Sequence, residues 1–465
     1  MSRGGIDLSE LTEQATLLER REVLLETARQ ALEFGDRATL RLVLNSQHPA
    51  DLAELLRLLS DDEREWVVPL VAEPLVSRAL AESDPLTVQQ VAAELDEEVL
   101  SDLVEDMAPD DAADVLGDLP VEQSERVLEL MEGEEASEVR ELMTHPEDSG
   151  GGIMTSRLVA VGQSHTVDQA VSNLREWADE EDILTLFVVD DERHLVGTVP
   201  LRRMLLASRD TLVGELADRD PICVRADVDQ EEIAAYFSEY DLLVLPVVDE
   251  DGELVGQVTV DDIVEVIQEE AAEDLSKMAA IGAHEDEERS AFGVMRRRLP
   301  WLLFCLVGTL VSGGVLDLFS GVLAAVTPLI LFVPAIMAMG GNSGIQTSTV
   351  TVRSLATGHA HTADLRRTVW RELRVAAGMG LLLGGAVYTV ARAWIGDETV
   401  ARCAGLAMLC AIVVSAVLGA VVPLAFRALR IDPAVASGPL ITTLNDILSL
   451  LIYFGIAAGL MQLWG

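Results

Sequence analysis

Positive charge is scarce in this sequence of 465 residues. It contains 33 lysines and arginines, among which Lys277 is the one lysine, against 79 aspartates and glutamates, so the formal net charge is −46. The phosphates of a nucleic acid would repel such a chain, which excludes a nucleic-acid-binding protein. Hydrophobic residues nevertheless make up 49% of the chain, which excludes an acidic disordered protein. Strong acidity combined with high hydrophobicity predicts two kinds of segment.

Several motifs of metal and enzyme chemistry are also missing. The four cysteines form no CxxC pair, and we interpret them as small buried hydrophobic residues. An intramembrane zinc protease needs HExxH, but the His-Glu pair at 284–285 continues as HEDEE, so this class of enzyme is excluded. We predict that the protein is not an enzyme. The absence of a DxDxDG loop excludes an EF-hand. The N-terminus lacks the apolar stretch of a cleaved signal peptide, so targeting must come from later segments.

The apolar residues are concentrated after Leu299. Residues 299–465 contain seven acids, whereas residues 1–298 contain the other 72. A helix that crosses a bilayer needs about 20 mainly apolar residues. Five runs of about this length predict five membrane-spanning helices, at residues 299–319, 321–340, 373–395, 402–426 and 436–462. The second run is the least regular, because it contains Pro328 and Pro334.

The arginines predict the orientation of these spans, because basic residues are enriched in cytoplasmic loops. Most of those near the spans lie before the first span, between the second and third, and after the fourth: Arg296, Arg297, Arg298, Arg353, Arg366, Arg367, Arg371, Arg374, Arg427 and Arg430. The opposite loops contain only Arg392 and Arg402, with Asp397 and Glu398 between them. Five alternating spans then place the acidic N-terminal half in the cytoplasm and the C-terminus outside. We therefore expect a multi-pass protein of the cell (inner) membrane.

A polar stretch, GGNSGIQTST at residues 340–349, directly follows the second predicted span. Small and polar residues at membrane depth are tolerated where the backbone is buried in protein or lines a water-filled path. An ordinary cytoplasmic loop is the alternative interpretation of this stretch.

A second polar stretch, TTLND at residues 442–446, lies inside the fifth predicted span. A carboxylate in a bilayer is costly, so it usually faces a bundle interior or an ion path. Gly438, Thr442 and Asp446 are four residues apart and share one helix face, which suits a wet path with one anionic site. The alternative is an aspartate that holds helices together by hydrogen bonds. No span has a basic residue near its centre, which argues against an anion path.

Residues 158–274 contain an internal repeat. LFVVD at 186–190 and LPVVD at 245–249 are 59 residues apart, and the same offset relates two LVG sequences. Each unit predicts the order strand, helix, strand, turn, strand and helix, with Asp251-Gly252 as a tight turn. The pattern resembles tandem CBS domains, an α/β module with two pseudo-symmetric halves, which we place at residues 151–274.

The resemblance to CBS domains implies a nucleotide site. These modules often bind adenine nucleotides through a threonine that follows a glycine and an aspartate three residues later. Thr259 and Asp262 fit this pattern in the second half, whereas Pro200 and Arg203 occupy the corresponding positions in the first half and do not fit. ATP is therefore a candidate ligand of one half, and a purely structural turn is the alternative.

Residues 1–150 predict amphipathic helices with short links. PADLAELL at 49–56 is similar to PDDAADVL at 109–116, which suggests a superhelix of stacked helical hairpins. Carboxylates are dense here and at the end of the CBS region: Asp106, Asp110, Asp111, Asp261, Asp262, Glu265, Glu269, Glu270, Glu273 and Asp274. Packed carboxylates repel one another unless a cation lies between them. Mg²⁺ and Ca²⁺ take such oxygen ligands, and a solvated acidic surface is the alternative.

A connecting helix at residues 275–298 is predicted to join the acidic half to the first span. The predicted fold is therefore a multidomain membrane protein with four parts. These are an α-helical superhelical N domain at 1–150, the α/β tandem CBS pair at 151–274, the connecting helix at 275–298 and a five-helix α transmembrane domain at 299–465.

This order of segments resembles the MgtE family of magnesium channels, over nearly the whole chain. In the cytoplasmic half the shared motifs are PED at 146–148, GGIMT at 151–155, DQEE at 229–232, YD at 240–241 and EAAED at 270–274. In the membrane half they are GGNSGIQ at 340–346 and TTLND at 442–446. The family often has asparagine where this chain has Gly438, so one contact at the pore mouth differs.

The resemblance implies Mg²⁺ uptake through a homodimer whose ion path lies at the dimer interface. Hydrated Mg²⁺ in the pore would be held by Asp446 together with Asn445, Thr442, Gly341, Asn342 and Gly344. Cytosolic Mg²⁺ would close the channel through the connecting, or plug, helices. The implied regulatory ligands are Asp106, Asp110, Asp229, Glu231, Asp241, Asp262, Glu265, Glu270 and Glu273. The expected partners are thus a second copy of the chain, the lipid bilayer and divalent cations, without nucleic acid.

Two other functions have to be weighed against this one. A coupled secondary carrier or exporter of divalent cations would have the same composition. A membrane-anchored nucleotide sensor without transport is disfavoured by Asp446 inside a span. The sequence does not separate a channel from a carrier, nor does it select among Mg²⁺, Co²⁺, Ni²⁺ and Mn²⁺.

Overall fold

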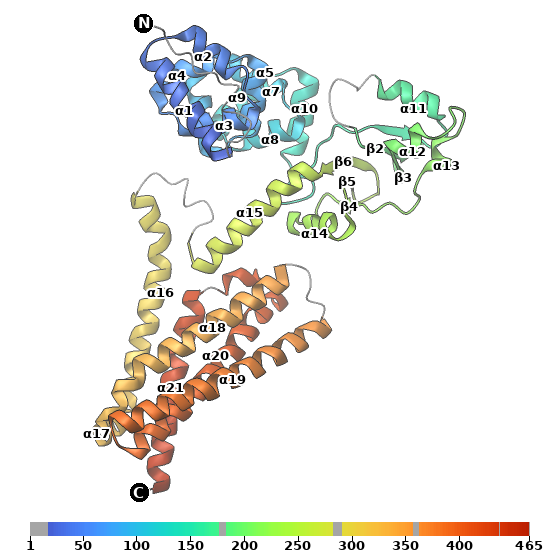
Figure 1. Cartoon of the computed structure of the whole chain (residues 1–465). Coiled ribbons are helices and arrows are strands. Elements are labelled where there is room, and N and C mark those ends of the chain that lie inside the picture. The colour runs from blue at the N-terminus through green and yellow to red at the C-terminus, as the bar shows by residue number, and fades with distance from the viewer. Residues whose placement is uncertain (1–16, 176–182, 282–290, 357–361, 437, 465) are drawn as a thin grey trace. The chain divides into compact units, whose positions relative to one another are not determined.

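The computed structural model describes residues 17–175, 183–281, 291–356, 362–436 and 438–464 (Figure 1). The chain divides into two compact units, Met1–Val266 and Ile267–Gly465. Each unit contains its own cluster of buried hydrophobic side chains. The structural boundary lies before the charge boundary at residue 299, so the acidic residues at the end of α15 belong to the second unit.

The first unit begins with short helices. They are α1 (Leu17–Glu33), α2 (Arg37–Leu44), α3 (Pro49–Leu58), α4 (Asp61–Val67), η1 (Val68–Leu70), α5 (Glu73–Ala81), α6 (Pro85–Glu94), α7 (Glu97–Glu105), α8 (Pro109–Gly117), α9 (Val121–Leu130) and α10 (Gly133–Leu142). The two similar segments at 49–56 and 109–116 form α3 and α8, and each helix starts at a proline whose missing N–H costs nothing there. Helices α1, α3, α5, α7 and α9 contact one another in succession, which confirms the predicted stacking.

The repeated region of the first unit forms two three-stranded sheets, of order β1-β2-β3 and β4-β5-β6. The first repeat contains β1 (Ala160–Gly162), α11 (Val167–Leu174), β2 (Thr185–Val189), β3 (Leu195–Pro200), α12 (Leu201–Leu205) and α13 (Val213–Leu216). The second contains β4 (Val224–Arg225), α14 (Gln230–Tyr240), β5 (Val244–Val248) and β6 (Leu254–Thr259). In each sheet the first pair of strands is parallel and the second antiparallel. Gly252, with a φ of 89°, makes the predicted turn between β5 and β6.

Helix α15 (Val260–Ala279) starts directly after β6 and runs past the predicted end of the CBS pair at residue 274. No glycine or proline interrupts it until Ala280 adopts a left-handed φ of 56°. The prediction of a separate helix at 275–298 therefore needs correction. Residues 275–279 belong to α15, residues 291–298 belong to the first membrane helix, and residues 282–290 lie outside the described residues.

The second unit contains the long apolar helices. Its elements after α15 are α16 (Ala291–Leu318), α17 (Ser320–Ala325), η2 (Thr327–Phe332), α18 (Val333–Ala356), α19 (Thr362–Trp394), α20 (Glu398–Ala428), η3 (Pro433–Val435) and α21 (Gly438–Trp464). Five segments of the described chain are long and apolar enough to cross a membrane, which agrees with the predicted number. Helix α20 packs against α18, α19 and α21, so it lies at the centre of this unit (Figure 1).

The second span was predicted in the wrong place. The apolar segment is Thr327–Leu355, not 321–340, and the GGNSGIQTST stretch lies in the middle of α18 rather than after a span. Pro328 and Pro334 fall in the first turns of η2 and α18, where proline is tolerated. Small residues let α18 approach its neighbours, because a Cβ at Gly344 would lie 2.5 Å from the Ser415 Oγ. Close packing thus explains why a stretch of low hydropathy belongs to a span.

Candidate ion path and acidic clusters

Asp446 lies within α21, eight residues after the first residue of that helix, and is half-buried. Since α21 is continuous, Gly438, Thr442 and Asp446 do share one face, as the sequence predicted. The Thr442 hydroxyl donates to the carbonyl oxygens of its own helix, at 2.9 Å from that of Gly438 and 3.1 Å from that of Pro439. Its lone pairs are therefore the part of the hydroxyl that a hydrated cation could use.

The neighbours of α21 show which way Asp446 points. Thr443 packs against Gly308 of α16, where an added Cβ would collide with the threonine methyl group. Asn445 packs against Gly340 of α18, where a Cβ would lie 2.8 Å from the amide oxygen. At about 100° per residue, Asp446 lies about 100° from Asn445 and about 60° from Thr443. The carboxylate therefore projects between the faces of α21 that contact α18 and α16.

The other predicted pore residues have different surroundings. Gly341 is buried beside α21, where an added Cβ would lie 3.6 Å from the Thr442 methyl group. Asn342 is exposed in the described chain. Gly344 is buried against Ser415 of α20, and Asn445 is 2% exposed. Packing of helices occupies these last two positions, so they do not present free groups to an ion as the sequence suggested.

Helix α8 and the start of α15 bring carboxylates together within the first unit, in what we call the α8–α15 cluster: Asp110, Asp111, Asp262 and Glu265, with Glu82 beside them. Asp110 and Asp111 lie in the first turn of α8, and Asp262 lies in the first turn of α15. The sequence predicted Asp110, Asp262 and Glu265 as ligands. Glu82, at the C-terminal end of α5, was missed because no local pattern links it to the others.

Burial and mutual repulsion change how these acids ionise. Burial and the charges of Asp110 and Asp262 raise the pKa of Asp111 to about 7. Burial raises the pKa of Asp262 to about 6, with a hydrogen bond from Thr259 opposing the shift and Asp110 adding to it. Burial also raises the pKa of Asp110. Groups that resist ionisation in this way are stabilised as carboxylates by a nearby cation.

One oxygen of Asp110 supports this view, because it is buried and accepts no hydrogen bond from the described residues. A buried polar atom without a partner is costly, and a cation would satisfy it. The cluster does not bring three carboxylates within 4.8 Å of one another. An ion held there would keep part of its water shell, as Mg²⁺ does in proteins.

The other predicted cytosolic ligands are more dispersed. Asp229 and Glu231 lie at the start of α14, where the Asp229 carboxylate accepts from the Glu231 amide at 2.9 Å. Asp241 ends the same helix, and the helix rise places it about 18 Å from Asp229 along the axis. Asp106 is the exposed C-terminal cap of α7. One chain therefore does not gather Asp229, Glu231 and Asp241 into a single site.

The end of α15 forms a second charged group within the second unit. Lys277 contacts Glu273 at 2.9 Å and Asp432 at 2.6 Å, and Asp432 lies in the loop that leads to α21. Although burial opposes it, hydrogen bonding to these two carboxylates raises the pKa of Lys277. The sequence predicted Glu270 and Glu273 but not Asp432, since nothing in a linear pattern brings residues so far apart together.

The predicted nucleotide residues contact each other. Thr259 ends β6, and its hydroxyl donates to the Asp262 carboxylate at 2.5 Å. Asp262 thus takes part both in this pair and in the α8–α15 cluster. In the first repeat Pro200 precedes α12, and Arg203 donates to the carbonyl of Leu216 at 3.0 Å.

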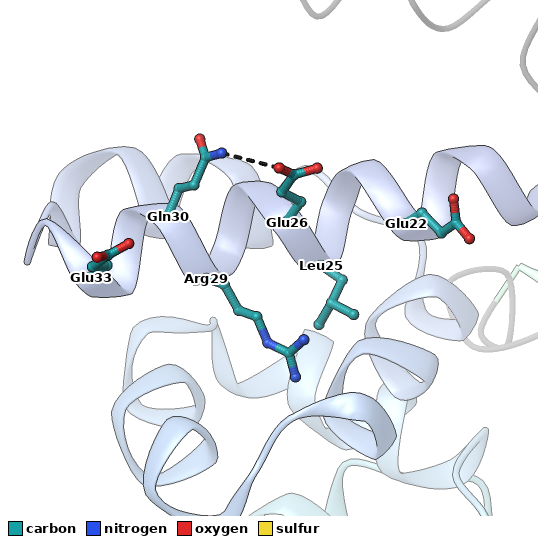
Figure 2. A pocket seen from close by; sticks show the side chains of 6 residues that line it. All are labelled: Glu22, Leu25, Glu26, Arg29, Gln30 and Glu33. Carbon is teal, nitrogen blue, oxygen red and sulfur yellow. Dashed lines mark hydrogen bonds between the residues drawn. The ribbon is translucent and has the colours of Figure 1, made fainter.

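Two further features were not predicted. A shallow surface hollow of about 400 Å³ lies along α1. All the lining residues in Figure 2 belong to this helix, and the Gln30 amide donates a hydrogen bond to the Glu26 carboxylate at 3.4 Å. In the described chain, one group of three potential ligand atoms lies within 4.8 Å: Asp190, Glu192 and His194. Asp190 already accepts from the amides of Glu192 and His194 at 2.9 Å, so the group is explained by the turn between β2 and β3.

Three parts of the chain match known protein families. Residues 47–148 match the MgtE intracellular N domain, residues 151–210 and 213–269 match the CBS domain, and residues 333–456 match a divalent cation transporter family. The magnesium transporter MgtE of Thermus thermophilus is 35% identical over 451 residues, which cover 95% of this chain and 99% of that protein. The chain belongs to the MgtE family of magnesium transporters.

Other MgtE relatives agree. The magnesium transporter MgtE of Bacillus subtilis is 37% identical over 319 residues, which cover 68% of this chain and 71% of that protein. The solved cytosolic domain of the Mg²⁺ channel MgtE in complex with ATP has 35% identity and a TM-score of 0.50, and covers 52% of this chain and 99% of that one. The solved soluble part of a magnesium transporter has 30% identity and a TM-score of 0.50, and the match covers 54% of this chain and 99% of that one. Magnesium transport, rather than an enzymatic reaction, is therefore the function of the family.

Proposed function

We propose that this MgtE protein is a Mg²⁺ channel for uptake that closes when cytosolic Mg²⁺ is plentiful. The position of Asp446 carries the transport part of the proposal. One half-buried carboxylate projects between α18 and α16 in a helix that is otherwise apolar or neutral. A single charge among neutral oxygens suits an ion that gives up its water reluctantly, since a stronger site would hold it too long. The coupled carrier is the less favoured alternative, because a solved relative is described as a channel.

We propose that the pore is completed by a second copy of the chain. A face that carries Asp446 is half-exposed in one subunit, and two such faces would enclose a path. Gly341, Asn342 and Thr442 would add neutral oxygens near the ion. The arginine distribution supports cytoplasmic N-terminal domains and an external C-terminus.

Gating would depend on the acidic residues of the cytoplasmic half. Without Mg²⁺, the α8–α15 cluster repels itself and disfavours contact between α8 and α15. When Mg²⁺ binds, its coordination by the carboxylates replaces their repulsion. The ion stabilises the closed state only by the difference between its binding free energies to the closed and open states. Asp106, Asp229, Glu231, Asp241, Glu270 and Glu273 would add further weak sites, some of them shared between subunits. Several weak sites acting together give a steep response.

A nucleotide would bind at Thr259 and Asp262 of the second CBS repeat. ATP is bound by the solved cytosolic domain of an MgtE relative. ATP added to the purified full-length protein should give a calorimetric signal that Asp262→Ala abolishes, while Asp168→Ala, an exposed acid of the first repeat, leaves it unchanged. Absence of heat with any adenine nucleotide would leave Asp262 as an ion ligand alone.

Flux in liposomes tests the whole proposal. Mg²⁺ uptake is measured while Mg²⁺ on the cytosolic side is varied and Na⁺ keeps the ionic strength constant, and protease protection is followed in parallel. We expect Mg²⁺ to stop flux and protect the cytoplasmic half in the same concentration range. If Na⁺ at equal ionic strength compacts the protein as well as Mg²⁺ does, the acidic residues form a screened surface and not a sensor.

A further inference from the structure

Asn445 lies beside Asp446 in α21 but does not share its surroundings. It is 2% exposed, whereas Asp446 is half-buried. Its amide nitrogen donates to the carbonyl oxygen of Met337 in α18 at 3.2 Å. Its amide oxygen accepts from the hydroxyl of Ser449, one turn further along α21, also at 3.2 Å. Both ends of the side chain are therefore used within the protein.

The backbone of α18 is shaped to receive this amide. A Cβ at Gly340 would lie 2.8 Å from the Asn445 oxygen, 2.9 Å from its nitrogen and 3.0 Å from the Ser449 oxygen. A side chain at position 340 would therefore force the Asn445 amide to shift from its place. The carbonyl of Gly340 accepts from Ser415 of α20 at 2.6 Å, so α20 holds the same point of α18 from another direction.

Asn445 belongs to a register between α21 and the chain that runs from η2 to α18. Ile441 meets Gly344, Asn445 meets Gly340 and Met337, and the Tyr453 hydroxyl donates to the carbonyl of Leu329 at 2.8 Å. The contacts at 441 and 453 are apolar or lie at the far end of the helix. Among the contacts described here, Asn445 makes the direct polar link to α18 nearest Asp446.

We infer that Asn445 is a positioning residue that fixes the rotation and height of α21, and so places the Asp446 carboxylate in the ion path. It is not itself an ion ligand. The inference rests on the proposed function of Asp446. Rotation of α21 about its axis would move residue 446 as much as residue 445, because adjacent helical residues turn together. A hydrogen bond between helices has a preferred direction and length, so it resists such a rotation.

The test separates positioning from simple packing by its effect on ion affinity. Uptake into liposomes without internal Mg²⁺ is measured as external Mg²⁺ is varied, and again with Ca²⁺ as competitor. Asn445→Ala should raise the half-saturating Mg²⁺ concentration at least fivefold and lower the Mg²⁺/Ca²⁺ preference. A packing defect would instead lower the maximal flux alone, because fewer channels would be folded.

A second substitution sharpens the distinction. Gly340→Ala alone should impair the protein, because its methyl group collides with the Asn445 amide. In the Asn445→Ala background the methyl group fills the vacated space, so the double variant should recover thermal stability. The half-saturating Mg²⁺ concentration of the double variant should stay raised, because the hydrogen bond to Met337 is still absent. Ser312→Ala is the matched control, since that buried hydroxyl bonds within its own helix, to Gly308 at 3.1 Å, and both readouts should stay unchanged.

The remaining outcomes are also decisive. If Asn445→Ala leaves half-saturation and the Mg²⁺/Ca²⁺ preference unchanged, or if Gly340→Ala restores both in the double variant, Asn445 only fills space and the inference is wrong. If Asn445→Ala does not insert, the isosteric Asn445→Asp, which lacks the donor to Met337, is judged by the same two readouts. Normal transport by Asp446→Asn would instead overturn the proposed path itself, whatever residue 445 does.

Discussion

The α8–α15 cluster of the first unit and the membrane helices of the second use carboxylates in opposite ways. In the first unit, Asp110, Asp111 and Asp262 lie in one cluster, and burial raises the pKa of each. Repulsion by neighbouring carboxylates raises the pKa values of Asp111 and Asp262 further. In the second, Asp446 is the one acid in α21, whose other residues are apolar or neutral. Repulsion stored in a cluster is released when a cation arrives, which suits a sensor. A lone charge attracts an ion without retaining it, which suits a path.

The comparison is tested most severely at Asp446, where we expect the largest effect. Asp446→Ala should reduce Mg²⁺ uptake at least 100-fold, and Asp446→Asn nearly as much, because the charge is lost while the shape is kept. Insertion and dimer formation, checked by chromatography in detergent, should persist. Asp317→Asn, an exposed acid at the end of α16, is the matched control and should transport normally. Wild-type flux through a well-folded Asp446→Ala dimer would remove the aspartate from the path.

The same contrast shows what could be predicted from sequence. The TTLND motif identified Asp446 because a charge inside an apolar run is visible locally. The GGNSGIQTST stretch was assigned to the wrong side of a span boundary, because hydropathy does not register the packing of Gly340 and Gly344 against neighbouring helices. The pore role predicted for Asn445 came from the family resemblance of the TTLND motif, whereas its hydrogen bond to α18 is not visible in the sequence.

The acidic half shows the corresponding limit for long-range contacts. The cluster at the end of the CBS repeat was found because its members are close in sequence. The pairing of α8 with α15 joins residues about 150 positions apart, and neither Glu82 nor Asp432 has a local signature. The repeat itself was predictable, because each half has the same order of strands and turns.

The second prediction concerns the sensor side of the comparison. Asp111→Asn combined with Asp262→Asn removes two charges from the α8–α15 cluster, which has two opposing effects. The repulsion that Mg²⁺ must overcome becomes weaker, but fewer carboxylates remain to bind Mg²⁺. We expect the loss of ligands to dominate, so the internal Mg²⁺ that halves flux should rise about tenfold, and Asp102→Asn, an exposed acid of α7, should change it little. Maximal flux at zero internal Mg²⁺ should be unchanged. A fall in the inhibitory concentration would mean that the cluster opposes closure even when Mg²⁺ is bound.

A smaller effect is expected where α15 meets the loop before α21. Lys277→Gln should break the contact with Asp432 and raise the inhibitory Mg²⁺ concentration about two- to fivefold, as partly exposed ion pairs contribute about 0.5–1 kcal/mol. The exchanged pair Lys277→Asp with Asp432→Lys should recover part of the loss. Arg371→Gln, which breaks a pair between adjacent residues of α19, serves as the control. Equal effects of the single and exchanged variants would show that residue identity, not the ion pair, matters.

The smallest effect concerns pH in the absence of Mg²⁺. Asp111 and Asp262 have pKa values of about 7 and about 6 in the folded protein, above the ordinary value of 3.8. Between pH 4 and 7 the folded state therefore binds more protons at these residues than the unfolded state does. Their contribution to the free energy of unfolding must fall as pH rises through this window.

Thermal unfolding in EDTA measures this contribution as the difference between wild type and Asp111→Asn/Asp262→Asn. The free energy of unfolding of the wild type should fall by about 1–2 kcal/mol relative to that of the variant between pH 5 and 8. The change is no larger than this because water screens these partly exposed groups. Saturating Mg²⁺ should weaken or reverse the difference, since the ion binds the carboxylates only after they lose their protons. If wild type instead gains stability relative to the variant as pH rises in EDTA, the carboxylates of α8 and α15 are paired with bases rather than with one another, and the contrast between the two units fails.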